Sequence, residues 1–132
     1  MKKYFTSQEA IATLPLVKSI VKDILRFGSA LKDRASFVIS SGLGKPEDDE
    51  DCVALAESLQ DLYIELEELG CEYKDWSYSV GLVDFPSLLE GNEILLCWRS
   101  DEETISHYHG IYEGFSGRKP LPSVYNSSFY KD

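Results

Sequence analysis

The chain lacks the segments that would carry it into or across a membrane. It has no run of the roughly 18 apolar residues that a transmembrane helix needs. Lys2 and Lys3 near its start are not followed by the apolar stretch of a secretion signal. We therefore expect neither a membrane-spanning helix nor a cleaved signal peptide, and we predict a cytoplasmic protein.

Cysteine is scarce. The three cysteines, Cys52, Cys71 and Cys97, are odd in number, far apart, and form no C-x-x-C pair. Disulfide-stabilised domains and thiolate zinc sites need paired or closely spaced cysteines. The sequence therefore predicts three reduced thiols, which suits a cytoplasmic protein.

Common catalytic motifs are also missing. The sequence contains no G-x-S-x-G, no G-x-x-x-x-G-K-[ST], no H-E-x-x-H, and no G-x-G-x-x-G after a strand. These motifs place nucleophiles, phosphate-binding loops and metal ligands in well-known enzymes. The usual routes to hydrolysis and nucleotide binding are therefore unsupported, and the sequence favours a binding domain over an enzyme.

Positive charge is in short supply. With 13 Lys and Arg against 23 Asp and Glu, the formal net charge is −10. Residues 46–73 carry 11 of these acids and no Lys or Arg, so the remainder has 23 − 11 = 12 acids against 13 bases. The negative electrostatic field of such a chain repels phosphate backbones and anionic lipid surfaces, so we expect neither a nucleic acid nor a membrane partner. The acidic run is either a solvated helix face or a surface for a basic protein partner.

Apolar residues are plentiful, at 43% of 132, which predicts one globular domain over residues 1–132. Thr6 and Glu9 form a capping-box pattern, and an apolar stripe at spacings of three and four follows it. A long amphipathic helix is expected over residues 7 to about 39, with a kink or a restart at Pro15. The stripe comprises Leu14, Val17, Val21, Ile24, Gly28 and Leu31.

A second helix follows the break around Gly42, Gly44 and Pro46. Its leucines are also three and four residues apart, and Gly70 is a natural stop; they are Leu55, Leu59, Leu62, Leu66 and Leu69. Two matching stripes joined by a short segment predict an antiparallel helical hairpin over about residues 7–70. Together with the outer apolar positions Ile20, Phe27 and Ile64, these stripes predict a homodimer built on the helices.

The last third reads as a small antiparallel sheet. Residues 93–99 and 104–110 are β-rich and flank an acidic turn, which predicts a β-hairpin. Residues 71–75 are a candidate third strand, and residues 81–91 read as a loop because Pro86 blocks regular pairing. The fold class is therefore α+β: a helical hairpin, then a β-hairpin and loop region over about residues 71–121, and an irregular tail over residues 122–132.

Two histidines lie two residues apart on the second strand of this β-hairpin. Residues at that spacing point to the same side of a strand, so His107 and His109 could hold one metal ion. A carboxylate would complete a set suited to zinc, manganese or iron, and the candidates are Asp84, Glu102, Glu103 and Glu113. The alternative is a pair of exposed or hydrogen-bonded histidines.

Cys97 and Arg99 are further candidates. Cys97 could be a nucleophile with His109 as its base, but its apolar strand favours an inert buried thiol. Arg99 could form a salt bridge with Asp84 or Glu102. Alternatively, Arg99 and Arg118 could clamp a small anion or carboxylate.

Several motifs in order give the chain a resemblance to a known family. They are "YFTSQEAIATLPLV", "GLVDFP", "LLCWR", Glu102, His109 and "GFSGRKPL". Together they resemble the bacterial family catalogued as domain of unknown function 2203, over Tyr4 to Leu121. By resemblance the family pattern falls on Lys74, Asp75, Gly81, Asp84, Phe85, Pro86, Cys97, Trp98, Arg99, Glu102, His109, Gly114, Gly117 and Arg118.

The chain departs from that pattern at three positions. Asp101 and Tyr108 stand where the family usually shows Gly and Trp, and His107 does not match the pattern. Because of this resemblance, the predicted metal ligands are no longer a histidine pair but His109 with Glu102 and Asp84. The family has no established activity, so it implies a shared fold and leaves the function open.

Two functional hypotheses follow. In the first, the chain is a binding or scaffolding domain that associates with itself through its helical hairpin. In the second, the 81–86 loop and the strand hairpin form a polar site that binds a metal or small anion, with hydrolysis as an extension. The candidate site residues are Asp84, Arg99, Glu102, His109 and Arg118, and Asp84, Glu102 and His109 are the predicted ligands for zinc or manganese.

Overall fold

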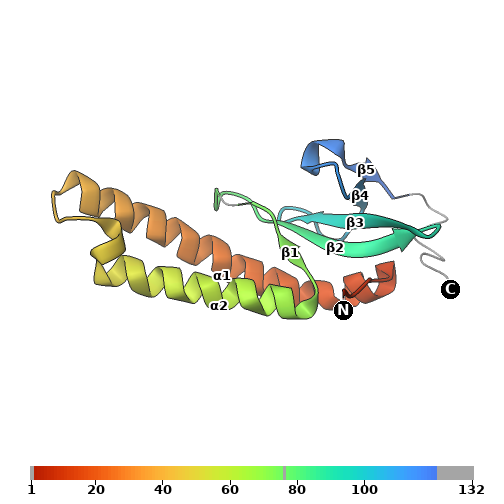
Figure 1. Ribbon diagram of the computed structural model, residues 1–132, viewed down its shortest axis with the longest axis horizontal. Coiled ribbons are helices and arrows are strands. Elements are labelled where there is room, and N and C mark those ends of the chain that lie inside the picture. The colour runs from red at the N-terminus through yellow and green to blue at the C-terminus, as the bar shows by residue number, and fades with distance from the viewer. Residues whose placement is uncertain (1, 76, 122–132) are drawn as a thin grey trace.

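The computed structural model describes residues 2–75 and 77–121. Two long helices form a hairpin, and a five-stranded antiparallel sheet packs against one end of it (Figure 1). This confirms the α+β class predicted from the sequence. The elements are α1 (Ser7–Ser40), η1 (Pro46–Asp48), α2 (Glu50–Leu69), β1 (Glu72–Tyr73), β2 (Leu82–Leu89), β3 (Asn92–Arg99), β4 (His107–Gly110), η2 (Phe115–Gly117) and β5 (Lys119–Pro120). The predicted irregular tail lies outside the described residues.

Helix α1 begins as its sequence predicts. The Thr6 hydroxyl accepts a hydrogen bond from the Glu9 amide, and the Glu9 carboxylate accepts one from the Thr6 amide, each at 2.9 Å. The helix then runs without a break through Pro15, so the expectation of a restarted helix was wrong. Pro15 lies on the exposed side, where water can satisfy the carbonyl of Ile11 that loses its helical donor.

Helix α2 is tied to α1 at the far end of the hairpin. Asp49 caps α2 by accepting the Cys52 amide at 3.1 Å, and both of its oxygens also accept bonds from the Arg34 guanidinium at 2.9 Å. This bidentate pair fixes how the two helices meet. Gly70 ends α2 with φ of 94°, which confirms the stop predicted there. None of the described helices is both long and apolar enough to cross a membrane.

The sheet includes a strand that the sequence analysis missed. Residues 82–89 form β2, which pairs with β3 along its whole length, so the loop predicted over residues 81–91 was wrong. The Pro86 carbonyl accepts the Phe5 amide at 2.7 Å on the side away from β3. The nitrogen and the carbonyl of one strand residue point to the same side. The Pro86 nitrogen, which carries no hydrogen, therefore also points away from β3, and the hydrogen bonds between β2 and β3 are not interrupted.

Strand β4 is shorter than predicted, because the turn before it extends from Ser100 to Ser106. Glu102 organises this turn: its carboxylate accepts the Arg99 amide at 2.9 Å, and its carbonyl accepts the Trp98 indole N–H at 2.9 Å. These bonds replace strand pairing, so β4 begins only at His107.

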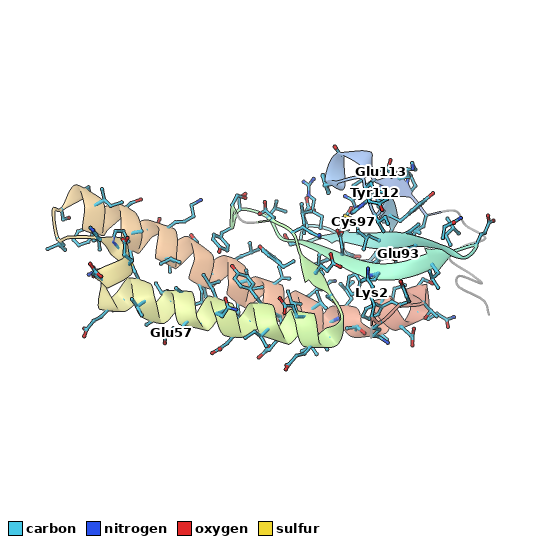
Figure 2. The ribbon with its side chains drawn as sticks, viewed as in Figure 1. Lys2, Glu57, Glu93, Cys97, Tyr112 and Glu113 are labelled. Carbon is cyan, nitrogen blue, oxygen red and sulfur yellow. The ribbon has the colours of Figure 1, made fainter. Side chains whose placement is uncertain are left out.

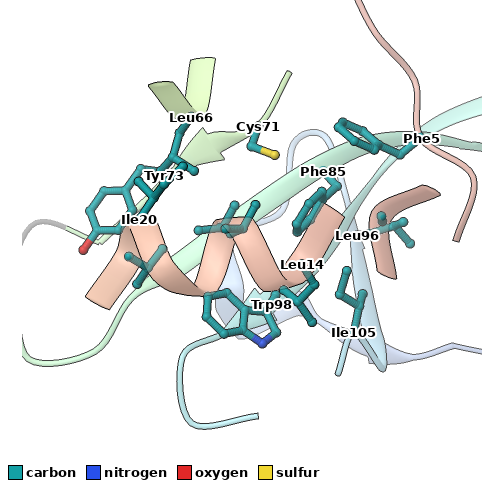
Figure 3. Packing of buried hydrophobic residues seen from close by; sticks show 14 of the residues in the cluster. Phe5, Leu14, Ile20, Leu66, Cys71, Tyr73, Phe85, Leu96, Trp98 and Ile105 are labelled. Carbon is teal, nitrogen blue, oxygen red and sulfur yellow. The ribbon is translucent and has the colours of Figure 1, made fainter. Parts of the chain in front are cut away.

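The hydrophobic core lies between one face of the sheet and α1 (Figure 3). Its largest side chains from the sheet are Phe85, Leu96 and Trp98, and Phe5 packs edge-on against Phe85 with ring centroids 5.3 Å apart. Ile20, predicted as an outer position, is buried in this core, so that part of the prediction was wrong. The far half of the hairpin extends beyond the sheet (Figure 1).

Candidate functional site

Three adjacent strands place polar side chains on the face of the sheet that points away from the helices. Asp84 of β2 is paired with Cys97 of β3, and Leu95 of β3 is paired with His109 of β4. Strand alternation puts these residues opposite the core side chains Phe85 and Trp98. One ligand atom each from Asp84, Cys97 and His109 lies within 4.8 Å of the others, and all three residues are buried.

His109 and Asp84 form a buried acid–base pair. The His109 Nδ1 lies 2.9 Å from the Gly110 carbonyl, which can only accept, so Nδ1 carries a hydrogen. Its Nε2 lies 3.1 Å from Asp84 Oδ1, and this contact needs one proton held by either partner. Burial raises the pKa of Asp84 above its usual range, and the neighbouring His109 opposes that rise. The pair therefore holds one proton between two potential metal ligands.

Cys97 lies beside this pair as a protonated thiol. Burial, and then the charge of Asp84, raises its pKa to about 12, and the positive charge of Arg118 opposes the rise. The Arg118 Nη2 also donates to the Cys97 carbonyl at 3.2 Å. The hypothesis that Cys97 is a nucleophile gains no support, because a thiol with this pKa is not ionised near neutral pH.

A pocket of about 280 Å³ opens above the three residues. Its walls are the apolar side chains Leu82, Leu95, Ile111 and Phe115, and Lys74 and Glu113 add one charge of each sign. Figure 2 labels Cys97, Tyr112 and Glu113 on the side of the sheet away from the helices. The polar residues thus lie in a recess with mainly apolar walls, as in many small-ligand sites.

The other predicted residues form a neighbouring cluster. The Glu102 carboxylate accepts a bond from Arg118 Nη2 at 2.9 Å, and its second oxygen lies 3.7 Å from His107 Nδ1. The salt bridge of Arg99 goes to Asp101, at 2.8 Å, and not to Asp84 or Glu102 as expected. The guanidinium groups of Arg99 and Arg118 both lie over Phe115. The structure therefore brings Asp84 and His109 together and places Glu102 with Arg118.

Sequence reasoning named Cys97 only as a possible nucleophile with His109 as its base, not as a metal ligand, and it gave Lys74 no role beyond its place in the family pattern. The signal for Cys97 was its position two residues before Arg99 on a strand, which puts it on the same face as that residue. Using it required recognising β2 as a strand, because only the register of β2 with β3 places Asp84 beside Cys97.

The family model for an uncharacterized conserved protein, DUF2203, matches residues 3–121. The chain belongs to the DUF2203 family. Neither the curated proteins nor the solved structures gave a match. The DUF2203 match covers every strand and the whole pocket.

Proposed function

We propose that this DUF2203 protein binds a transition-metal ion, preferentially zinc, through His109 Nε2, Cys97 Sγ and Asp84 Oδ1. The observation that carries the proposal is the clustering of these three buried atoms within 4.8 Å. Tetrahedral zinc binds nitrogen, sulfur and oxygen at about 2.0–2.3 Å, so its ligand atoms lie about 3.3–3.8 Å from one another. The side chains would have to approach one another by up to about 1 Å to reach that arrangement.

The surroundings support zinc over manganese. A thiolate is a soft ligand that zinc accepts and manganese does not favour. The Gly110 carbonyl holds His109 in the tautomer that points Nε2 at the site, which is the usual outer support of a metal-binding histidine. The ion would take the place of the proton shared by His109 and Asp84, and of the thiol proton of Cys97.

Thermal unfolding with and without zinc tests the proposal. Zinc at about 100 times its dissociation constant should stabilise the wild-type protein by about 2.7 kcal/mol, and the His109→Ala variant should gain nothing. The matched control is His107→Ala, which removes an imidazole two residues away on the same strand and should keep the full gain. If zinc shifts none of the three proteins and none copurifies, the proposal is wrong.

Self-association through the helices is a second candidate. Phe37, Ile39 and Leu43 are 51%, 66% and 62% exposed at the far end of the hairpin, beyond the reach of the sheet (Figure 1). Single apolar residues are normal on a surface, but several large ones at one end of a hairpin favour an interface there. A second copy placed against this end would cover them and complete a four-helix bundle.

The mass in solution at tens of micromolar tests this candidate. We expect a dimer for the wild type and a monomer for the double variant Phe37→Glu with Leu43→Glu, because charges at the interface oppose its burial. Leu16→Glu is the control, since Leu16 is 51% exposed on the same helix, far from residues 37–43. Leu62→Lys is unsuitable, because it should disrupt the hairpin whether or not a dimer forms. A monomeric wild type would rule the candidate out.

A further inference from the structure

We infer that the pocket receives a small organic carboxylate, with its charged group between the bound metal and Lys74 and its apolar part against the pocket walls. This inference rests on the proposed metal site and names the class of ligand that completes it. The residues that carry it are Lys74, the apolar walls and the set Asp84, Cys97 and His109.

The metal would have an open coordination position. Its three ligands come from adjacent strands of one sheet, so the sheet fills the space beneath the ion and the pocket lies above it. Within residues 2–75 and 77–121, no fourth His, Cys, Asp or Glu joins this group. Glu113 lines the pocket, but its Oε1 accepts the Gly110 amide at 2.8 Å and lies 3.5 Å from Lys119 Nζ. Zinc with three protein ligands takes water or an added ligand in its fourth position.

Lys74 offers a cationic partner for an anionic donor at that position. A carboxylate and a thiolate from the protein neutralise a divalent ion, so Lys74 is the cation left at the pocket, which Glu113 also lines. Lys74 follows directly after β1, and its Nζ lies 2.9 Å from Oε1 of Glu72, two residues earlier in the chain. An anion bound to the metal would lie within the field of Lys74.

The walls favour a carboxylate over phosphate. Leu82, Leu95, Ile111 and Phe115 present apolar surface, which suits a hydrocarbon chain and not the fully polar surface of phosphate. Glu113 adds a negative charge that opposes a dianion more strongly than a monoanion. The volume of about 280 Å³ lies just below the range of about 300–1,000 Å³ typical of pockets for drug-sized ligands, so the ligand is small.

Cobalt(II)-substituted protein tests the inference, because the absorption spectrum of cobalt reports both on the Cys97 ligand and on the fourth coordination position. A thiolate-to-cobalt charge-transfer band would show that Cys97 binds the ion, and the visible d–d bands report the fourth position. We expect hexanoate to change the d–d bands with an affinity at least about tenfold above that of acetate, because its chain is buried against the walls. Inorganic phosphate should bind more weakly than hexanoate.

Matched lysine variants locate the anion. Lys74→Met should weaken hexanoate binding about tenfold without changing cobalt affinity, because it removes the charge partner of the carboxylate. Lys119→Met makes the same change in net charge near Glu113, outside the pocket lining, and should leave hexanoate affinity nearly unchanged.

The experiment distinguishes failure of the metal site from failure of the carboxylate ligand. If the thiolate-to-cobalt band is absent, both the proposed metal site and this inference are wrong. If that band is present but hexanoate leaves the d–d bands unchanged, only the carboxylate ligand is wrong. The same conclusion follows if phosphate binds more tightly than hexanoate, or if Lys74→Met and Lys119→Met lose equal hexanoate affinity.

Discussion

Replacing Cys97 with serine is expected to lower the zinc affinity of this protein by at least about 100-fold while leaving the fold intact. Loss of an outer partner of a metal ligand already costs about 10–100-fold in affinity, and Cys97 is proposed as a ligand itself. A serine hydroxyl is of similar size but does not ionise at neutral pH, so it cannot replace the thiolate. Competition with a chromophoric chelator measures the affinity, and circular dichroism checks the fold.

Cys71→Ser is the matched control for this experiment. Cys71 is also a buried thiol, and burial raises its pKa to about 12, but it belongs to the hydrophobic core and not to the pocket. Its replacement should leave zinc affinity unchanged. Equal losses in the Cys71 and Cys97 variants would show that zinc binding depends on general stability, and an unchanged affinity in Cys97→Ser would remove the thiolate from the site.

Replacing Trp98 with alanine is expected to reduce the free energy of unfolding by about 3–5 kcal/mol, the usual cost of emptying a large aromatic site in a core. Trp98 is buried between the sheet and α1, and its indole N–H donates to the Glu102 carbonyl at 2.9 Å. The variant loses this packing and also the bond that holds the turn before β4. Urea denaturation followed by far-ultraviolet circular dichroism measures the change.

Tyr112→Ala is the control for the Trp98 variant. Tyr112 is 96% exposed, so its loss should change the free energy of unfolding by less than about 0.5 kcal/mol. A loss below about 1 kcal/mol for Trp98→Ala would contradict the position of the indole in the core.

Cys97 and Trp98 are neighbours in the sequence but lie on opposite faces of β3. Trp98 belongs to the core against α1, and Cys97 belongs to the pocket on the other face. The two variants should therefore separate metal binding from stability, because strand alternation keeps their surroundings apart.

The sequence by itself determined the helices and the fold class. The reciprocal bonds of Thr6 and Glu9 and the stop at Gly70 act within a few residues, and the apolar spacing needs only the geometry of one helix. It also placed Asp84 and His109 among the candidate site residues, since their chemistry is visible without a partner.

Only the tertiary structure decided which residues meet. The register of β2 with β3 places Asp84 beside Cys97. The Pro86 carbonyl, on the side of β2 away from β3, accepts a hydrogen bond from Phe5, which is far away in the sequence. The Glu102 carboxylate accepts bonds from the Arg99 amide and from Arg118, and it therefore lies in the turn before β4 and not beside Asp84. These pairings join distant segments, and a strand's partner depends on the packing of the whole sheet against α1, which no local pattern of residues encodes.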